Sequence, residues 1–144
     1  MLMMARIAAM VVLLVPLLTG QSAAQERHKW WADENTRKEI GLTDDQAAKA
    51  EEIFQGSLPR LKELNGALDT LEKELSALIR ENQADEAVLA AKIDDVEKVR
   101  SELSKTRILM LYRIHRLLTP EQNEKFKVML DRMRDRRKSS DPRR

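Results

Sequence analysis

The fold of this chain is decided by residues 61–78, LKELNGALDTLEKELSAL. Leucine recurs in this stretch at alternating spacings of three and four residues. This spacing places the leucines on one face of an α-helix, with a period of about 3.5 residues, as in a coiled-coil seam. We therefore expect a long amphipathic helix, from Asp44 to about Arg80, that packs on a neighbouring helix through its leucine face.

A proline lies inside this predicted helix, in the sequence Gly56-Ser57-Leu58-Pro59. Proline removes one backbone hydrogen bond, and its ring clashes with the carbonyl group four residues earlier. We expect the helix to bend near Pro59 and to continue beyond it.

A second long helix is predicted after the polar connector of residues 81–84. Asp85 is expected to cap this helix, which should run to about Leu117. Two long helices joined by a short connector predict an all-α fold, a long kinked antiparallel hairpin with short flanking helices. The apolar residues expected on the inward face of the second helix are Leu89, Ile93, Val96, Val99, Leu103, Met110, Ile114 and Leu117.

Two five-residue segments share the pattern Leu-Thr-x-x-Gln: LTDDQ at residues 42–46 and LTPEQ at residues 118–122. This pattern predicts a capping box, in which Thr accepts a hydrogen bond from the Gln amide and the Gln side chain bonds back to the Thr amide. Each copy should begin a helix, the second running from Pro120 to about Lys138. The residues that carry the two motifs are Leu42, Thr43, Gln46, Leu118, Thr119 and Gln122.

Apolar residues outside the hairpin seam need a further partner, because each arm of a two-helix hairpin has only one neighbour. One group is the run Ile108-Leu109-Met110-Leu111. The final helix carries the other, which consists of Phe126, Met129, Leu130 and Met133. We expect hairpins of two identical chains to pack on each other as a symmetric homodimer.

The first 24 residues are typical of a cleavable signal peptide. Arg6 precedes an apolar run of residues 7–18, and small residues precede a cleavage site after Ala24. The run is shorter than the ~20 residues of a membrane-spanning helix, so an uncleaved anchor is the less favoured alternative. These features predict that the chain is exported, and export argues against a nucleic-acid partner. The predicted helices then form one helical domain over residues 25–131.

Composition excludes several kinds of site and leaves the charge nearly balanced. The 144 residues include 26 Lys and Arg, 24 Asp and Glu, and no Cys, which excludes disulfides and thiolate chemistry. Residues 132–144 contain seven basic and two acidic residues, a local net charge of 7 − 2 = +5, and are expected to form a disordered tail. This tail is interpreted as solvated, with electrostatic attachment to an anionic partner as the alternative.

Enzymatic motifs are missing from the sequence. It contains no Gly-rich phosphate loop, no His-Glu-x-x-His run and no Ser nucleophile elbow. We therefore expect a protein that is not an enzyme.

The two Leu-Thr-x-x-Gln motifs, in a small helical chain with an export signal, resemble the Spy/CpxP family of periplasmic chaperones and its heavy-metal-resistance relatives of the ZraP and CnrX types. The resemblance covers residues 30–133. It implies a hooked helical hairpin that dimerises into a cradle in the periplasm. It also implies binding of unfolded client proteins without ATP, or a role as an envelope-stress adaptor.

The metal-sensing branch of that family is the second hypothesis, with signalling to a membrane-bound partner. Imidazole and thioether groups suit transition metals, yet the chain has only two histidines, His28 and His115. Neither has a second His four residues away. We therefore expect no cofactor and no complete metal site within one protomer, with His28 and His115 as the only weak candidates for a divalent metal.

The chaperone hypothesis requires a surface that combines apolar and positively charged groups. Alternating basic and apolar residues in the second long helix could provide one. At helical spacing, Met110 and Ile114 also fit core positions, and the pair Trp30-Trp31 is expected to pack over the hairpin. The candidate client-binding residues are Arg100, Arg107, Met110, Tyr112, Arg113 and Ile114.

Overall fold

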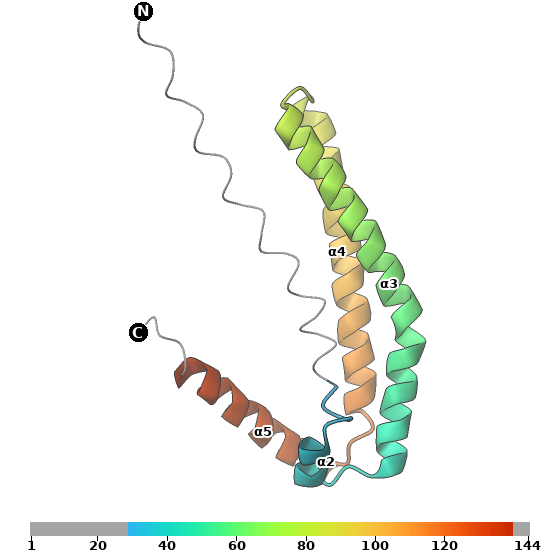
Figure 1. The fold of residues 1–144 in the computed structure, drawn as a ribbon, viewed down its shortest axis with the longest axis vertical. Coiled ribbons are helices and arrows are strands. Elements are labelled where there is room, and N and C mark those ends of the chain that lie inside the picture. The colour runs from blue at the N-terminus through green and yellow to red at the C-terminus, as the bar shows by residue number, and fades with distance from the viewer. Residues whose placement is uncertain (1–28, 140–144) are drawn as a thin grey trace, which may run out of the picture.

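The computed structural model describes residues 29–139, and in that range the chain forms four helices and no strand. Figure 1 shows two long helices as a hairpin, with the short helix and the start of the last helix gathered at its base. The predicted all-α fold is confirmed. The helices are α2 (Glu34–Ile40), α3 (Asp44–Glu81), α4 (Glu86–His115) and α5 (Pro120–Ser139).

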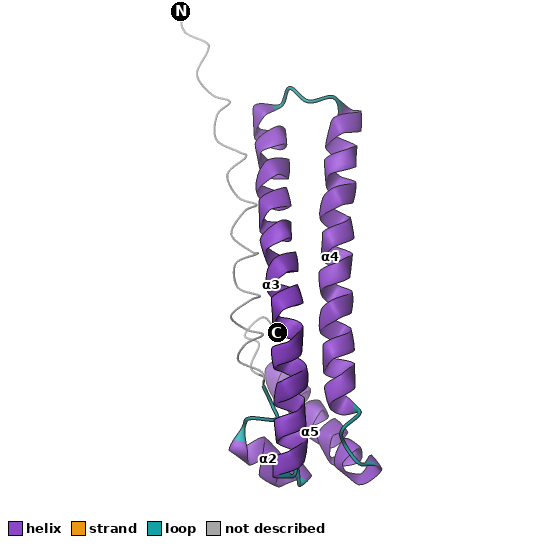
Figure 2. Ribbon diagram, turned by 90° about the vertical axis from the view of Figure 1, so that its right-hand side faces the viewer, coloured by secondary structure: helices purple, strands orange, loops and turns teal. Residues whose placement is uncertain are grey.

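Helices α3 and α4 lie side by side and are joined by residues 82–85 (Figure 2). Asn82 ends α3 in the left-handed conformation, with φ of 52°, and its amide donates to the carbonyl of Leu78 at 3.2 Å. Asn tolerates this conformation better than most residues do. Asp85 occupies the N-cap of α4 but its side chain makes no capping hydrogen bond, so the expected side-chain cap is wrong.

Helix α3 continues through Pro59 without ending, as predicted. Two residues earlier, the hydroxyl of Ser57 donates to the carbonyl of Ile53 at 2.9 Å. The helix is bowed along its length in Figure 1; a discrete kink at Pro59 stays a prediction. The predicted leucine face does point toward α4, with Leu61 and Leu64 buried and the four later leucines half-buried.

The inward face of α4 is largely as predicted. Val96, Leu103, Met110 and Ile114 are buried. Ile93 is 42% exposed, so its placement on the inward face is wrong. It lies in the part of the hairpin far from the base, where a helix with a single neighbour can cover only a narrow stripe.

The main core lies at the base of the hairpin, where all four helices and the Trp30-Trp31 segment meet. Ile40 of α2 and Ile114 of α4 are completely buried. Phe126 and Met129 of α5 are also buried in this core. The expectation that these two residues face a second copy of the chain is therefore wrong, because the protomer itself covers them.

Helix α5 leaves the base and diverges from the hairpin, so that the two form the sides of a V in Figure 1. It remains helical to Ser139, and Arg132 forms an ion pair with Glu39 of α2. Residues 132–139 are thus not disordered, and that part of the tail prediction is wrong. Residues 140–144 and the predicted signal peptide lie outside the described residues.

Among residues 29–139, none of the helices combines the length and the hydropathy that crossing a membrane requires.

Candidate binding surfaces

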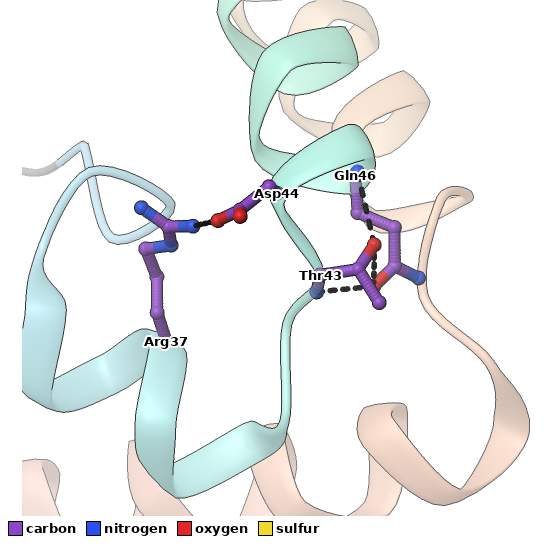
Figure 3. A network of polar contacts seen from close by, with 4 residues as sticks. All are labelled: Arg37, Thr43, Asp44 and Gln46. Atoms are coloured by element: carbon purple, nitrogen blue, oxygen red, sulfur yellow. Dashed lines mark hydrogen bonds and ion pairs between the residues drawn. The ribbon is translucent and has the colours of Figure 1, made fainter.

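The first Leu-Thr-x-x-Gln motif forms the predicted capping box at the start of α3 (Figure 3). The amide of Gln46 donates to Thr43 Oγ1 at 3.1 Å, and the amide of Thr43 donates to Gln46 Oε1 at 3.0 Å. Arg37 of α2 forms an ion pair with Asp44 in the first turn. The turn between α2 and α3 is therefore fixed by the capping box at the start of α3 and by the ion pair from α2.

The second motif forms the same box at the start of α5. The amide of Gln122 donates to Thr119 Oγ1 at 3.2 Å, and the amide of Thr119 donates to Gln122 Oε1 at 2.9 Å. Both predicted capping boxes are confirmed as local structures. Leu42 and Leu118, which precede the two caps, are half-buried against the core.

The two boxes also bind each other. Gln46 Nε2 donates to Gln122 Oε1 at 2.8 Å and to the carbonyl of Leu117 at 2.8 Å. In return, Gln122 Nε2 donates to Gln46 Oε1 at 2.9 Å and to the carbonyl of Gly41 at 2.7 Å. Each glutamine thus bonds to the residue that precedes the other motif. We call this reciprocal arrangement the glutamine clasp.

The sequence predicted two separate caps and did not predict the clasp. A signal for it was present, because both motifs carry a glutamine at the same position, and these two glutamines form the clasp. Each side-chain amide group has two hydrogens, and each hydrogen is donated to an oxygen atom of the clasp. Neither glutamine therefore leaves an unpaired donor in this half-buried site. The clasp joins the start of α3 to the start of α5.

A cavity of about 270 Å³ lies in the angle between the hairpin and α5, and we call it the elbow cavity. Its walls come from the Trp30-Trp31 segment, α3, α4 and α5 and are mostly aromatic and aliphatic. The residues that line it are Trp30, Trp31, Phe54, Leu58, Leu61, Lys62, Asn65, Arg107, Met110, Leu111, His115, Phe126 and Leu130.

The charged groups that line the elbow cavity are both basic side chains. Arg107 is half-buried, and burial lowers the pKa of its guanidinium group. Among the described residues, Arg107 forms no ion pair and no carboxylate lines the cavity. Lys62 is exposed at the same site. The elbow cavity is therefore apolar with a positive side.

His115 lies in the aromatic wall of this cavity. Its ring centroid is 5.8 Å from that of Trp30 and 4.8 Å from that of Phe126. Burial lowers the pKa of His115 below the usual 6.5, because the apolar surroundings disfavour the charged imidazolium. The neutral imidazole is thus the favoured form at neutral pH.

Metal ligands are scarce around His115. Within residues 29–139, no group of three or more His, Cys, Asp or Glu side chains could hold a metal ion. Met110 lines the same cavity and adds one thioether. His28, the other weak candidate, lies outside the described residues. The donors of one described protomer therefore do not fit a complete transition-metal site.

The Trp30-Trp31 segment is anchored by Glu51, a residue that the sequence did not single out. Glu51 accepts hydrogen bonds from Trp31 Nε1 at 2.9 Å, Lys29 Nζ at 2.9 Å and Gln55 Nε2 at 2.7 Å. These donors lower the pKa of Glu51 to about 2, with Gln55 contributing most. Lys29 also lies over the ring of Phe54, 4.2 Å from its centroid. The predicted packing of both Trp residues on the hairpin is confirmed.

The structure distributes the predicted client-binding residues over several places. Arg100 bridges the two arms of the hairpin through Glu72 at 2.8 Å. Ile114 is completely buried, so it belongs to the core and cannot contact a client in this structure. Arg107 and Met110 line the elbow cavity, and Met110 is only 5% exposed.

Tyr112 and Arg113 lie on an exposed surface of α4. Ile108, Leu109 and Tyr112 are 62%, 42% and 55% exposed. Residues four apart in a helix are neighbours, which places Arg113 beside Leu109 and Arg116 beside Tyr112. Arg116 Nη1 approaches the Tyr112 hydroxyl at 3.5 Å. We call these five residues the α4 outer face, a surface where large apolar groups alternate with arginines.

Comparison with known proteins gives one match. The sequence model of a family described as heavy-metal resistance matches residues 7–140, nearly the whole chain. Neither the curated proteins nor the solved structures include a match to this chain.

Proposed function

Because the chain belongs to the heavy-metal resistance family, we propose that it acts as an exported, non-enzymatic chaperone or envelope-stress adaptor of the Spy/CpxP type. It binds unfolded or misfolded proteins in the periplasm without ATP. In this proposal the protein works as a homodimer, whose two hairpins provide a larger surface than one protomer does.

The α4 outer face is the observation that carries this proposal. An unfolded protein exposes apolar side chains. A chaperone that works without ATP must bind them with an apolar surface that is accessible to solvent, while the chaperone itself remains soluble. Ile108 and Tyr112 expose more than half of their surface, whereas most large apolar residues at the base are buried. The neighbouring arginines, Arg113 and Arg116, add positive charge that accelerates encounter with acidic segments.

The test is suppression of aggregation of a chemically denatured client by the purified protein, in the presence of chelator. The decisive variant is the double substitution Ile108→Ser with Tyr112→Ser. Its matched control is Val128→Ser, which removes an apolar residue of similar exposure, 56%, from α5. We expect the wild type and the control to suppress aggregation and the double variant to lose most of the activity.

The same samples are analysed by light scattering, because an exposed apolar face could also be a subunit interface. An unchanged mass with lost activity supports client binding by the α4 outer face. A reduced mass of the double variant would assign this face to dimerisation and contradict the proposal. Absence of suppression by the wild type would remove the chaperone function itself.

A metal-responsive role is the second candidate, and the description of the family favours it. His115 is the residue best suited to such a role, since its neutral imidazole is the form that binds transition metals. A specific site would need donors beyond one protomer, such as the second His115 of a dimer. A rise in melting temperature with micromolar zinc, copper or nickel that His115→Ala abolishes would support a sensor, which would signal to a membrane-bound partner.

A further inference from the structure

We propose that the elbow cavity binds a single-chain amphiphilic carboxylate, a medium-chain fatty-acid anion, with its alkyl chain inside and its carboxylate on Arg107. This site lies apart from the α4 outer face, and the inference does not depend on the chaperone proposal. Three features of the cavity carry it: its size, its unbalanced charge and its small number of polar partners for a peptide backbone.

Size and lining fit one alkyl chain. The volume of about 270 Å³ is many times the roughly 10–15 Å³ that one buried water molecule needs, which leaves room for a chain of several methylene groups. Rings of Trp30, Phe54 and Phe126 line the cavity with leucines of α3, α4 and α5. Such walls favour transfer of methylene groups out of water, by about 0.8 kcal/mol for each group.

Charge selects an anion. Two basic side chains near the cavity have acidic partners: Lys29 pairs with Glu51, and Arg100 pairs with Glu72 and Glu97. Arg107 is half-buried and has no such partner in the described structure, although it lies in an apolar wall. A cation removed from water without a counter-charge is costly, and a carboxylate at the mouth of the cavity would offset that cost. Lys62 adds a second positive charge.

Polar partners for a peptide backbone are few. Apart from the Trp30-Trp31 segment, the walls are helices, whose backbone groups are bonded within each helix, so they offer no strand edge. The side-chain amide of Asn65 donates to the carbonyl of Leu61 at 2.9 Å. A ligand with one charged end and an otherwise apolar body therefore matches this cavity better than a peptide does.

The cavity contains its own reporter. The chain has two tryptophans, Trp30 and Trp31, and both line the cavity. Tryptophan fluorescence of the purified full chain is titrated with decanoate, decanol and decyltrimethylammonium, each below its micellar or solubility limit. We expect saturable binding of decanoate, with an affinity at least tenfold higher than that of either probe of the same chain length.

Variants separate charge from packing. Arg107→Gln should reduce the affinity for decanoate about tenfold and abolish its preference over decanol, whereas Arg107→Lys should retain that preference. Arg113→Gln, on the outer face of the same helix, is the matched control and should bind as the wild type does. Circular dichroism verifies that the variants are folded.

Three results would overturn the inference: no saturable change in fluorescence, equal binding of decanoate and decanol by the wild type, or equal losses in Arg107→Gln and Arg113→Gln. The chaperone proposal is tested independently, because Ile108→Ser with Tyr112→Ser should leave decanoate binding unchanged.

Discussion

At the scale of single residues, the glutamine clasp concentrates more interactions than any other polar site in the described chain. Gln122 is buried, at 9% exposure, and its side chain bonds to Thr119, Gly41 and Gln46. One side chain thus caps a helix and also fixes the start of another helix. Each net hydrogen bond contributes about 1 kcal/mol, and a buried group left unpaired costs more.

Gln122→Ala should therefore lower the free energy of unfolding by about 3 kcal/mol, measured by urea denaturation. The control is Gln83→Ala in the exposed connector between α3 and α4, which should change stability by less than about 0.5 kcal/mol. Equal losses of unfolding free energy in the two variants would show that the hydrogen bonds of the clasp do not stabilise the fold.

The clasp also predicts coupling. Gln46→Ala removes the same reciprocal bonds from the other side, so the double variant with Gln122→Ala should lose less stability than the two single losses added together. The expected difference is about 1 kcal/mol or more. Strict additivity in a double-mutant cycle would mean that the two capping boxes act separately.

Glu51 predicts a pH dependence of stability. Its pKa is lowered from 4.5 to about 2 in the folded chain, so the folded state favours the carboxylate. The resulting stabilisation is present above about pH 4.5 and is lost as the pH falls toward 2. Because the side chain is 38% exposed, solvent screens the interaction, and we expect roughly 1 kcal/mol.

The measurement compares urea unfolding of Glu51→Gln and the wild type between pH 7 and pH 2.5. The variant should be less stable at neutral pH, with the difference shrinking as the pH is lowered below 4.5. Glu52→Gln, an exposed neighbour on the same helix, is the control. A difference that stays constant over this range would contradict the assignment of the lowered pKa to the hydrogen bonds that Glu51 accepts from Gln55, Trp31 and Lys29.

At the scale of elements, the hairpin is unevenly supported along its length. Near the base, α3 and α4 are covered by α5 and the Trp30-Trp31 segment, whereas toward the connector each helix contacts only the other. Val96 is the one fully buried residue of that outer part, at 2% exposure, while Ile79, Val88 and Ile93 are exposed. Local opening should therefore begin at the connector end.

Hydrogen exchange followed by mass spectrometry should show residues 70–95 exchanging at least tenfold faster than the helical segments at the base. Val96→Ala should lower stability by about 2 kcal/mol, and Val88→Ala, the exposed control, should change it little. Uniform protection along the hairpin would indicate that another surface, such as a second copy of the chain, covers its outer part.

At the scale of the whole molecule, one protomer leaves apolar surface exposed on α4 and at the connector end of the hairpin. The base of α5, by contrast, is already covered within the protomer, so a homodimer would have to use the hairpin faces. We predict a mass by light scattering of about twice that of one mature chain of 144 − 24 = 120 residues at micromolar concentration. A monomer mass at this concentration would contradict the homodimer.

Local features of the sequence determined the helices. The leucine spacing of residues 61–78, the two capping boxes and the polar connector each depend on residues within a few positions of one another, and each was predicted correctly in kind. The exceptions were also local. Asp85 does not form its predicted cap, and residues 132–139 continue α5 almost to its predicted end at Lys138 instead of forming the disordered tail that their charge suggested.

Only the tertiary structure determined which of these local elements contact one another. Gln46 and Gln122 are 76 positions apart, so their bonds depend on how the hairpin folds back. The same packing separates three arginines of one helix: Arg100 bridges the arms, Arg107 enters the cavity and Arg113 faces outward. Sequence periodicity gives the face of a helix, but neighbouring helices determine whether that face is core, cavity or free surface, because burial depends on what lies opposite.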